Sequence, residues 1–440
     1  MKFYDRTEEI EKLQTVAEKS KQQAQFTVLT GRRRIGKTQL LLKTFENQTF
    51  LYFFVARKAE VLLCQDYQHE IETKLQILIP GTIGSFTSLF EYLLKLAEHQ
   101  NITLIIDEFQ EFFSVNPSVY SDMQRLWDLY KGRSKINLIV AGSVIALMHR
   151  IFENNKEPLF GRANHFIKLR PFTTDTLKEI LKDYHPNSKP DDLLALYSFT
   201  GGVAKYVEAL MDEGAVSKEE MITHIISRDS LFIQEGKNTL IEEFGKDYAI
   251  YFSILTAIAS GYQGRTAIED LLKREIGGYL TRLEKDFQLI SKTQPMFTKS
   301  RTKNIKYRIE DNFLFFWFRF IYKYSYMAEI EAYNQLQEIV KRDYNAYSGM
   351  MLEKYFRIKA IESKNYTAVG NYWDRKGENE IDLIALNEIS KQVEVAETKR
   401  NKDKISLGIL RQKMDSVLTI YPKLKKYQIQ YKSYGLEDML

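Results

Sequence analysis

The residues best placed to do chemistry lie in one short segment, FTVLTGRRRIGKTQLLL, at residues 26–42. Gly31 ends an apolar run, and Gly36, Lys37 and Thr38 follow at the spacing G-x-x-x-x-G-K-[ST], which is typical of a P-loop. Glycines at these positions let backbone N–H groups surround phosphate oxygens at the positive N-terminal end of a helix. The segment therefore predicts a binding site for a nucleoside triphosphate.

The side chains of this loop have distinct expected roles. Lys37 would reach the β- and γ-phosphates, and the Thr38 hydroxyl would be a ligand of Mg²⁺. The expected nucleotide-binding residues are Gly31, Arg32, Arg33, Arg34, Ile35, Gly36, Lys37, Thr38 and Gln39. ATP and Mg²⁺ are the expected cofactors.

An acidic pair, Asp107 and Glu108, ends the apolar run ITLIID. This is the form of a Walker B element, in which Asp107 holds the Mg²⁺ shell and Glu108 polarises the attacking water. A later apolar run, INLIVAGS, ends in Ser143, where nucleotidases of this layout carry a polar sensor of the γ-phosphate. A serine there also fits as the cap of the next helix, and the two roles are compatible.

Acidic and basic residues recur in the C-terminal third of the chain. Asp382 lies within the apolar run EIDLIAL, Glu397 and Lys399 close the run VEVAETK, and Glu353 lies on a preceding helical segment. Carboxylates on adjacent strands can bind Mg²⁺, and a nearby lysine can stabilise a hydroxide nucleophile. The pattern indicates the D…E-x-K layout of restriction-type nucleases. Charged residues that merely end two strands are the alternative.

The hydrophobic pattern predicts the elements that position these residues. In residues 26–169, apolar strand-like runs alternate with helical segments, which indicates a parallel sheet wrapped by helices. Residues 173–233 are helical only, as in a lid. Residues 247–309 predict two or three helices and a hairpin, the element order of a winged helix. Strand-like and helical runs after residue 348 predict a C-terminal α/β domain.

The predicted hairpin is basic, with no acidic residue between positions 291 and 309. Its six basic residues are Lys292, Lys299, Arg301, Lys303, Lys306 and Arg308. Such a hairpin could bind DNA phosphates, and a solvated hairpin kept for packing is the alternative. The aromatic segment NFLFFWFRFIYKY that follows is too short and too charged to span a membrane, so we expect a buried helix there.

Composition is consistent with several packed domains. The chain has 440 residues, 44% of them hydrophobic, and a net charge of +5 that permits nucleic acid as a partner without requiring it. The single cysteine, Cys64, excludes an internal disulfide framework and suits a reducing compartment. Neither a membrane helix nor the apolar core of a signal peptide is found, so we expect a cytoplasmic protein with no membrane contact.

The chain resembles the archaeal-type ATPase family in the order of its motifs. These are GRRRIGKT, LIIDEFQE, VAGS, FGR, GGVAKYVE and the terminal EID…E-x-K. This family belongs to the AAA+/STAND-like P-loop NTPases. The three arginines within the P-loop and the N-terminal segment FYDRTEEIEKL carry the resemblance most specifically. It implies an ATPase core followed by a winged helix and a C-terminal domain related to PD-(D/E)XK nucleases.

The resemblance also implies roles for single residues. Residues 3–6, including Arg6, would flank the adenine. Arg162 would act as an arginine finger, in trans within a homo-oligomer, and its alternative is an ion pair with a surface carboxylate. Asp382 and Glu397 would bind the metal of a nuclease site. The sequence departs from the family pattern at Ala204, where proline is usual, which leaves the nucleotide contact of the lid open.

The predicted fold is thus a multidomain α/β architecture. It consists of a P-loop ATPase core (1–170), a helical lid (171–240), a winged helix domain (241–330) and a restriction-endonuclease-like α/β domain (331–440). Two functions fit it. In the first, ATP binding and hydrolysis control DNA engagement and Mg²⁺-dependent cutting. In the second, the protein is a non-cutting NTP-controlled switch whose C-terminal module only binds DNA or a partner protein.

Overall fold

The computed structural model of the protein describes residues 1–244, 247–298 and 304–440. These divide into two compact units, residues 5–170, and residues 171–440 together with residues 1–4. None of the helices in the described ranges combines the length and the hydropathy needed to cross a membrane.

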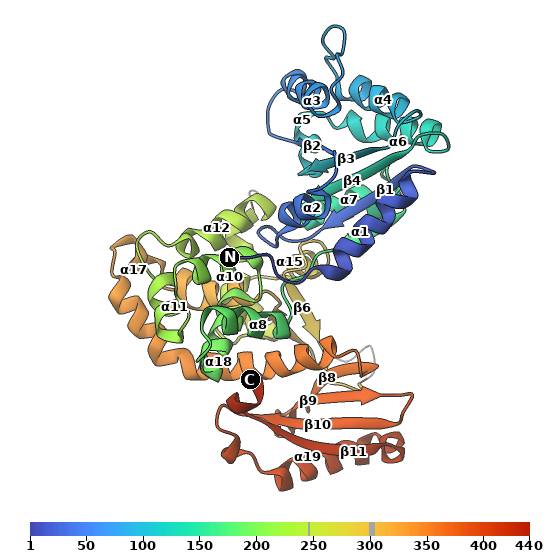
Figure 1. Cartoon of the computed structure of the whole chain (residues 1–440). Helices are drawn as coiled ribbons and strands as arrows, with labels where there is room; N and C mark the ends of the chain where they lie inside the picture. Colours follow the sequence, from blue (N-terminus) through green and yellow to red (C-terminus); the bar gives the residue numbers. More distant parts are fainter. Residues whose placement is uncertain (245–246, 299–303) are drawn as a thin grey trace. The chain divides into compact units, whose positions relative to one another are not determined.

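The unit of residues 5–170 is built on a five-stranded parallel sheet in the order β2-β3-β4-β1-β5 (Figure 1). Its strands are β1 (Gln25–Thr30), β2 (Leu51–Phe54), β3 (Ile102–Asp107), β4 (Ile136–Gly142) and β5 (His165–Lys168). Its helices are α1 (Thr7–Ser20), α2 (Lys37–Phe45), α3 (Glu60–Leu75), α4 (Phe86–Leu96), α5 (Phe112–Val115), α6 (Ser118–Tyr130) and α7 (Ile145–Glu153). The predicted parallel α/β core is confirmed.

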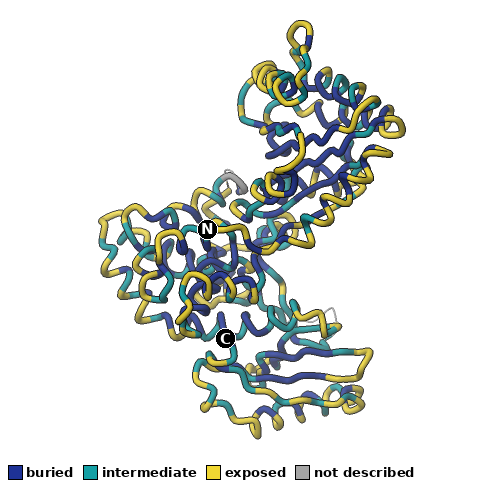
Figure 2. The backbone as a smooth tube through the Cα atoms, viewed as in Figure 1, coloured by how far each residue is buried: buried dark blue, intermediate teal, exposed yellow. Residues whose placement is uncertain are grey.

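The central strands of this sheet are buried along nearly their whole length, which Figure 2 shows as dark blue tube. Continuous apolar strands are expected where helices cover both faces of a parallel sheet. Aromatic contacts fix the helices to the sheet: the ring of Phe26 meets that of Trp127 edge-on at 5.1 Å, and Phe53 stacks on Tyr67 at 4.2 Å. Since all five strands are parallel, their carboxyl ends lie along one edge of the sheet.

The second unit begins with helices only, as predicted for a lid. These are α8 (Thr174–Tyr184), α9 (Pro190–Thr200), α10 (Ala204–Asp212), α11 (Lys218–Ile225) and α12 (Leu231–Phe244). The first residues of the chain also bind to this unit, because the Tyr4 hydroxyl donates to Asp183 at 2.9 Å and the N-terminal amino group pairs with Asp212.

Three helices and an antiparallel hairpin follow, in the predicted order. They are α13 (Tyr248–Ala259), α14 (Arg265–Leu272), α15 (Gly277–Lys285), β6 (Ile290–Thr293) and β7 (Lys306–Ile309). The aromatic segment then forms α16 (Asn312–Phe316), a π-helical turn (Trp317–Tyr322) and α17 (Ser325–Glu329). Trp317 is buried and lies so close to Gly236 that a Cβ there would be 2.3 Å from its ring, which agrees with the predicted buried helix.

The C-terminal part is a four-stranded mixed sheet in the order β11-β10-β9-β8. Its elements are α18 (Tyr333–Glu362), β8 (Ala368–Trp373), β9 (Glu380–Asn387), β10 (Gln392–Thr398), α19 (Leu407–Ile420) and β11 (Gln428–Tyr434). Strands β8, β9 and β10 are antiparallel, and β11 runs parallel to β10. Val395 packs with Met414 of α19, whereas Ala396 packs with Ala360 of α18, so each helix covers one face of the sheet.

Short 3₁₀ turns complete the fold. They span Phe109–Glu111, Lys402–Lys404, Pro422–Lys426 and Leu436–Met439.

The basic hairpin packs against this C-terminal sheet. Lys306 pairs with Glu380 at 3.2 Å and lies over the ring of Trp373, and the backbone N–H of Met296 donates to Asn371. Arg308 is partly buried rather than solvated. Three further basic residues of the predicted DNA contact, Lys299, Arg301 and Lys303, lie outside the described residues. Lys306 and Arg308 therefore face protein, whereas Lys292 of β6 is exposed, and the DNA contact of this hairpin stays a prediction.

Candidate functional site

The P-loop connects β1 to α2, and its backbone conformation explains its glycines. Gly36 adopts φ 98°, a left-handed conformation that favours glycine. At Gly31 a Cβ would lie 3.0 Å from the carbonyl oxygen of Leu169. Arg34 is also left-handed, with φ 66°. This conformation turns the loop into the first turn of α2, where the unpaired N–H groups of the helix are located.

Lys37 lies inside this loop. Its side chain is only 6% exposed, and Nζ donates to the carbonyl oxygens of Gly31 at 2.9 Å and Arg32 at 3.2 Å. Burial lowers the pKa of Lys37, and the nearby carboxylates of Glu108 and Asp107 oppose that change. The lysine and the two acidic residues that the sequence predicted for this site are therefore brought together.

Asp107 is bound by three donors. Its Oδ2 accepts hydrogen bonds from the hydroxyls of Thr38 and Tyr52, both at 2.7 Å, and its Oδ1 accepts from the backbone N–H of Glu108. Hydroxyl and carboxylate oxygens are ligands that Mg²⁺ prefers, so Thr38 and Asp107 fit the expected ion. Tyr52 was not predicted, because its place in a buried aromatic strand gave no sign of a polar contact. Burial and the charge of Asp107 raise the pKa of this phenol.

Glu108 lies in a left-handed backbone conformation, φ 52°, at the end of β3. Its Oε2 accepts hydrogen bonds from the Ser143 hydroxyl at 2.7 Å and from the Gln110 amide at 2.5 Å. Ser143 does not cap α7, whose N-cap is Val144 without a side-chain hydrogen bond. The residue predicted as a phosphate sensor thus contacts the residue predicted to activate water.

The remaining predicted nucleotide-site residues are placed differently. Arg6 is buried, and its Nη2 lies 3.5 Å from the carbonyl oxygen of Ile35, so it reaches the P-loop. Burial lowers its pKa, and the charge of Glu9 opposes that change. Arg34 and Gln39 are exposed. Ile35 is buried.

Arg162 points along the protein surface. Its Nη2 pairs with Asp128 of α6 at 3.0 Å, and its Nη1 donates to the carbonyl oxygen of Phe160. This is the surface ion pair that was the alternative for this residue. A role in trans remains a prediction.

In the C-terminal sheet, Asp382 and Glu397 lie on the same face. Side chains alternate along a strand, so Asp382 shares the face of Ile384, and Glu397 shares that of Val395, which both pack toward α19. Asp382 Oδ2 accepts a 2.8 Å hydrogen bond from the backbone N–H of Thr398, which lies next to Glu397. The two predicted carboxylates therefore come together near the end of β10.

The electrostatics of this site reflect crowded carboxylates. Burial raises the pKa of Asp382, and the charge of Glu397 raises it further. Burial also raises the pKa of Glu353, and the charge of Asp382 raises it further. A divalent cation is one group that relieves such repulsion, and Mg²⁺ commonly uses only one or two carboxylates. Within the described ranges, however, no three His, Cys, Asp or Glu side chains are grouped as a metal site.

The predicted lysine is not beside these carboxylates. Lys399 is exposed, lies beyond the end of β10, and donates from Nζ to the carbonyl oxygen of Lys404. Lys413 of α19 instead contacts Glu397, with Nζ 3.0 and 3.2 Å from its two carboxylate oxygens. The sequence indicated a helix here, but the side of that helix that faces the sheet was not readable.

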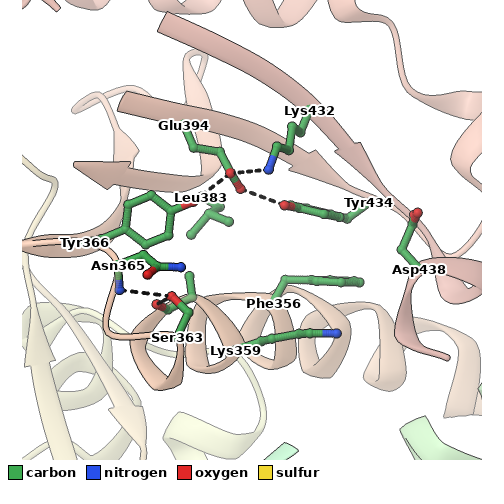
Figure 3. Close-up of a pocket in the computed structure, with 11 residues that line it drawn as sticks. Phe356, Lys359, Ser363, Asn365, Tyr366, Leu383, Glu394, Lys432, Tyr434 and Asp438 are labelled. Atoms are coloured by element: carbon green, nitrogen blue, oxygen red, sulfur yellow. Dashed lines mark hydrogen bonds and ion pairs between the residues drawn. The ribbon is translucent and has the colours of Figure 1, made fainter. Parts of the chain in front are cut away.

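A pocket lies on the opposite face of the same sheet (Figure 3). Its wall includes Glu394, which accepts hydrogen bonds from the hydroxyls of Tyr366 and Tyr434 and pairs with Lys432. Glu394 is three residues from Glu397 on β10 and so faces the other way. Because these polar groups bind one another, we interpret this network as structural.

Comparison with known proteins agrees with this geometry. Residues 3–210 match a family described as an ATPase domain predominantly from Archaea, and residues 317–410 match a family of archaeal and bacterial proteins of unknown function. The fold is similar to that of a Walker-type ATPase of Pyrococcus abyssi, with a TM-score of 0.56 at 18% identity over 72% of this chain and 96% of that chain.

A relative in sequence covers more of the chain. The protein is 30% identical over 407 residues to the uncharacterized protein MJECL04 of Methanocaldococcus jannaschii, an alignment that spans 90% of this chain and 87% of the relative. The chain therefore belongs to the same family as this Methanocaldococcus jannaschii protein, and its N-terminal half is an ATPase domain of the kind found predominantly in Archaea.

Proposed function

We propose that this ATPase controls a C-terminal domain that binds DNA and cleaves it with Mg²⁺. In the ATPase domain, Lys37 would bind the β- and γ-phosphates, and Thr38 and Asp107 would hold Mg²⁺, which neutralises phosphate charge when bound. Glu108 would accept a hydrogen bond from the attacking water and orient it. Ser143 would donate to the γ-phosphate. The hydrogen bonds that join Thr38 to Asp107 and Ser143 to Glu108 support these roles.

One observation carries the proposal for the C-terminal domain. Asp382 and Glu397 lie on one face of the sheet, close enough that the charge of Glu397 raises the pKa of Asp382. Like charges held together at a partly buried position are costly unless a cation or a substrate uses them. We assign these two carboxylates as ligands of Mg²⁺. Lys413 takes the role that the sequence predicted for a neighbouring lysine. The three helices and the hairpin that precede the domain support a winged helix as the DNA-binding part.

DNA cleavage and ATP hydrolysis measured on the same preparations test this proposal. We expect supercoiled plasmid to be nicked with Mg²⁺ by the wild-type protein and not by Asp382→Ala, whereas both hydrolyse ATP at the same rate. Glu394→Gln is a matched control, because it changes a carboxylate on the same strand that faces the other way. Cleavage that persists in Asp382→Ala contradicts the proposed site.

A second candidate is a non-cutting switch, in which the C-terminal domain only binds DNA or a partner protein. It is favoured by the ion pair between Lys413 and Glu397, which neutralises one of the carboxylates without a metal. Under this alternative the wild-type protein cleaves no DNA with any divalent metal. Its DNA affinity would then differ between ATP-bound and ADP-bound states, as measured by fluorescence anisotropy.

A further inference from the structure

We propose that Gln110 is a positioning residue for ATP hydrolysis. Its amide would fix the Glu108 carboxylate so that one oxygen stays free for the attacking water. The inference rests on the proposed role of Glu108 and adds a residue that neither the P-loop nor the Walker B pattern assigns.

Gln110 reaches Glu108 because the chain turns sharply at the end of β3. Glu108 adopts φ 52°, and the 3₁₀ turn Phe109–Glu111 begins at the next residue. The Gln110 side chain therefore points back toward Glu108, and its Nε2 donates to Oε2. A carboxylate only accepts hydrogen bonds, so the amide must present its NH₂ group and not its oxygen.

The surroundings of Gln110 indicate a role for this donor beyond packing. The side chain is only 1% exposed, and its Oε1 has no hydrogen-bond partner among the described residues. It is held against Gly142, where a Cβ would lie 2.6 Å from this oxygen. An unpaired buried acceptor destabilises the fold, and an apolar side chain of similar length would avoid that cost. The NH₂ group of the same amide donates to Glu108, and this contact offsets that cost.

The two oxygens of Glu108 differ in their contacts. Oε2 accepts from both Gln110 and Ser143, and neither of these bonds goes to Oε1. The charge of Glu108 acts on Lys37, which places Glu108 near the P-loop lysine. A carboxylate anchored through one oxygen presents the other in a fixed direction, which is what a water-activating group requires.

Gln110 becomes more important when nucleotide is bound. The Ser143 hydroxyl has a single proton to donate. If that proton goes to the γ-phosphate, as proposed for Ser143, the hydrogen bond from Ser143 to Glu108 is lost. The Gln110 amide then remains as the donor that fixes Glu108.

Gln110→Met tests the inference, because methionine has a similar length and cannot donate. We expect kcat for ATP to fall about 10- to 100-fold, the effect of losing one hydrogen bond to a charged group, while KM and the Kd for an ATP analogue change less than about twofold. Asn137→Leu is the matched control. Asn137 of β4 is also fully buried with an unpartnered amide oxygen, but it contacts Thr103 and not the site, so kcat should not change.

A second variant separates positioning from loss of folding. Gln110→Glu keeps the shape of the side chain but donates only when the new carboxyl is protonated. We expect its kcat, relative to the wild type, to rise as the pH is lowered from 8 to 6. A kcat of Gln110→Met within twofold of the wild type, or a flat relative profile for Gln110→Glu, would overturn the inference. Glu108→Gln tests the proposed role of Glu108 separately. If that variant hydrolyses ATP at the normal rate, the role of Glu108 is wrong, whatever the Gln110 variants show.

Discussion

The hydroxyl of Thr38, in the first turn of α2, donates a 2.7 Å hydrogen bond to the carboxylate of Asp107 at the end of β3. The two residues are 69 positions apart in the sequence. They meet because the P-loop and the Asp107 carboxylate both lie at the carboxyl edge of one parallel sheet. This is the edge at which open α/β sheets bind their ligands.

Substitutions of Lys37 and Glu108 should impair different steps, nucleotide binding and ATP hydrolysis. We expect Lys37→Ala to lose nucleotide affinity, because the ammonium that meets the phosphates is removed. Glu108→Gln should bind ATP normally and lose turnover, since only the group that orients water is changed. Equilibrium binding of a fluorescent ATP analogue and steady-state phosphate release measure the two effects. Normal hydrolysis by Glu108→Gln would show that another group activates the water.

Tyr52→Phe should weaken the response to Mg²⁺. The Tyr52 hydroxyl and Thr38 both donate to Asp107 Oδ2, so removing the phenol leaves Asp107 held by fewer donors. We expect the Mg²⁺ concentration for half-maximal ATPase rate to rise about 3- to 10-fold, less than the full effect of a hydrogen bond to a charged group, because Thr38 and the Glu108 N–H still hold Asp107. Tyr67→Phe, which removes a hydroxyl bonded to the Phe54 carbonyl, should leave it unchanged.

Arg162 can be tested by mixing variants. If it acts on the nucleotide of a neighbouring subunit, ATPase activity per subunit rises with protein concentration, and a mixture of Arg162→Ala with Lys37→Ala recovers part of the turnover. Asp128→Asn is the control, because it breaks the surface ion pair and leaves the arginine in place. Full activity of a monomer at low concentration would leave Arg162 as a surface residue paired with Asp128.

Lys413, which contacts the carboxylate site, and Lys399, which the linear motif predicts there, give opposite expectations. Lys413→Met should abolish DNA cleavage, because Lys413 contacts Glu397, whereas Lys399→Met should keep it within about threefold, since Lys399 is exposed and bonded to Lys404. Mn²⁺ binding measured by calorimetry provides an independent readout: affinity should rise in Lys413→Met, where no cation competes for Glu397. If Lys399→Met loses cleavage and Lys413→Met keeps it, the lysine of the site is Lys399, as the E-x-K motif predicts, and the assignment of Lys413 is wrong.

Asp191, near the N-terminus of α9, should make stability depend on pH. It pairs with Arg400 at 2.8 Å and with Lys218 at 3.0 Å. Burial raises the pKa of Asp191, but these two partners outweigh burial and leave the pKa below its usual range. The stabilisation is therefore complete above the unfolded-state pKa of about 3.9 and is lost as the pH falls through the lower folded-state pKa.

Asp191→Asn should remove this dependence. At pH 7 we expect a loss of about 1–3 kcal/mol of unfolding free energy, less than for a fully buried pair because these side chains keep some solvent contact. As the pH falls from about 4 through the lower folded-state pKa, the variant and the wild type should converge. Denaturant unfolding across pH 3–7 measures this, with the exposed residue Asp270 changed to asparagine as the control. Parallel curves for Asp191→Asn and the wild type would contradict the assignment.

The sequence by itself determined the class of the N-terminal domain and the core of its site. The P-loop is contiguous, so its strand, glycines, lysine and threonine are positioned by local geometry alone. Asp107 and Ser143 could also be predicted, because parallel strands bring their carboxyl ends to one edge. In the C-terminal domain, the sequence predicted that Asp382 and Glu397 lie on strands, and the antiparallel register of β9 and β10, in which Ala396 pairs with Leu383, decided that they share one face.

Only the tertiary structure decided which other side chains complete these sites. Tyr52 and Gln110 lie in apolar segments whose pattern indicates burial, and their polar contacts depend on how the strands and the turn after β3 pack. Lys399 follows Glu397 by two residues, but β10 ends at Thr398, so the alternation that would align the two side chains no longer applies. Lys413 takes that place because it lies next to Met414 on the side of α19 that packs against the sheet, and the strand residue that it meets depends on where the helix lies on the sheet.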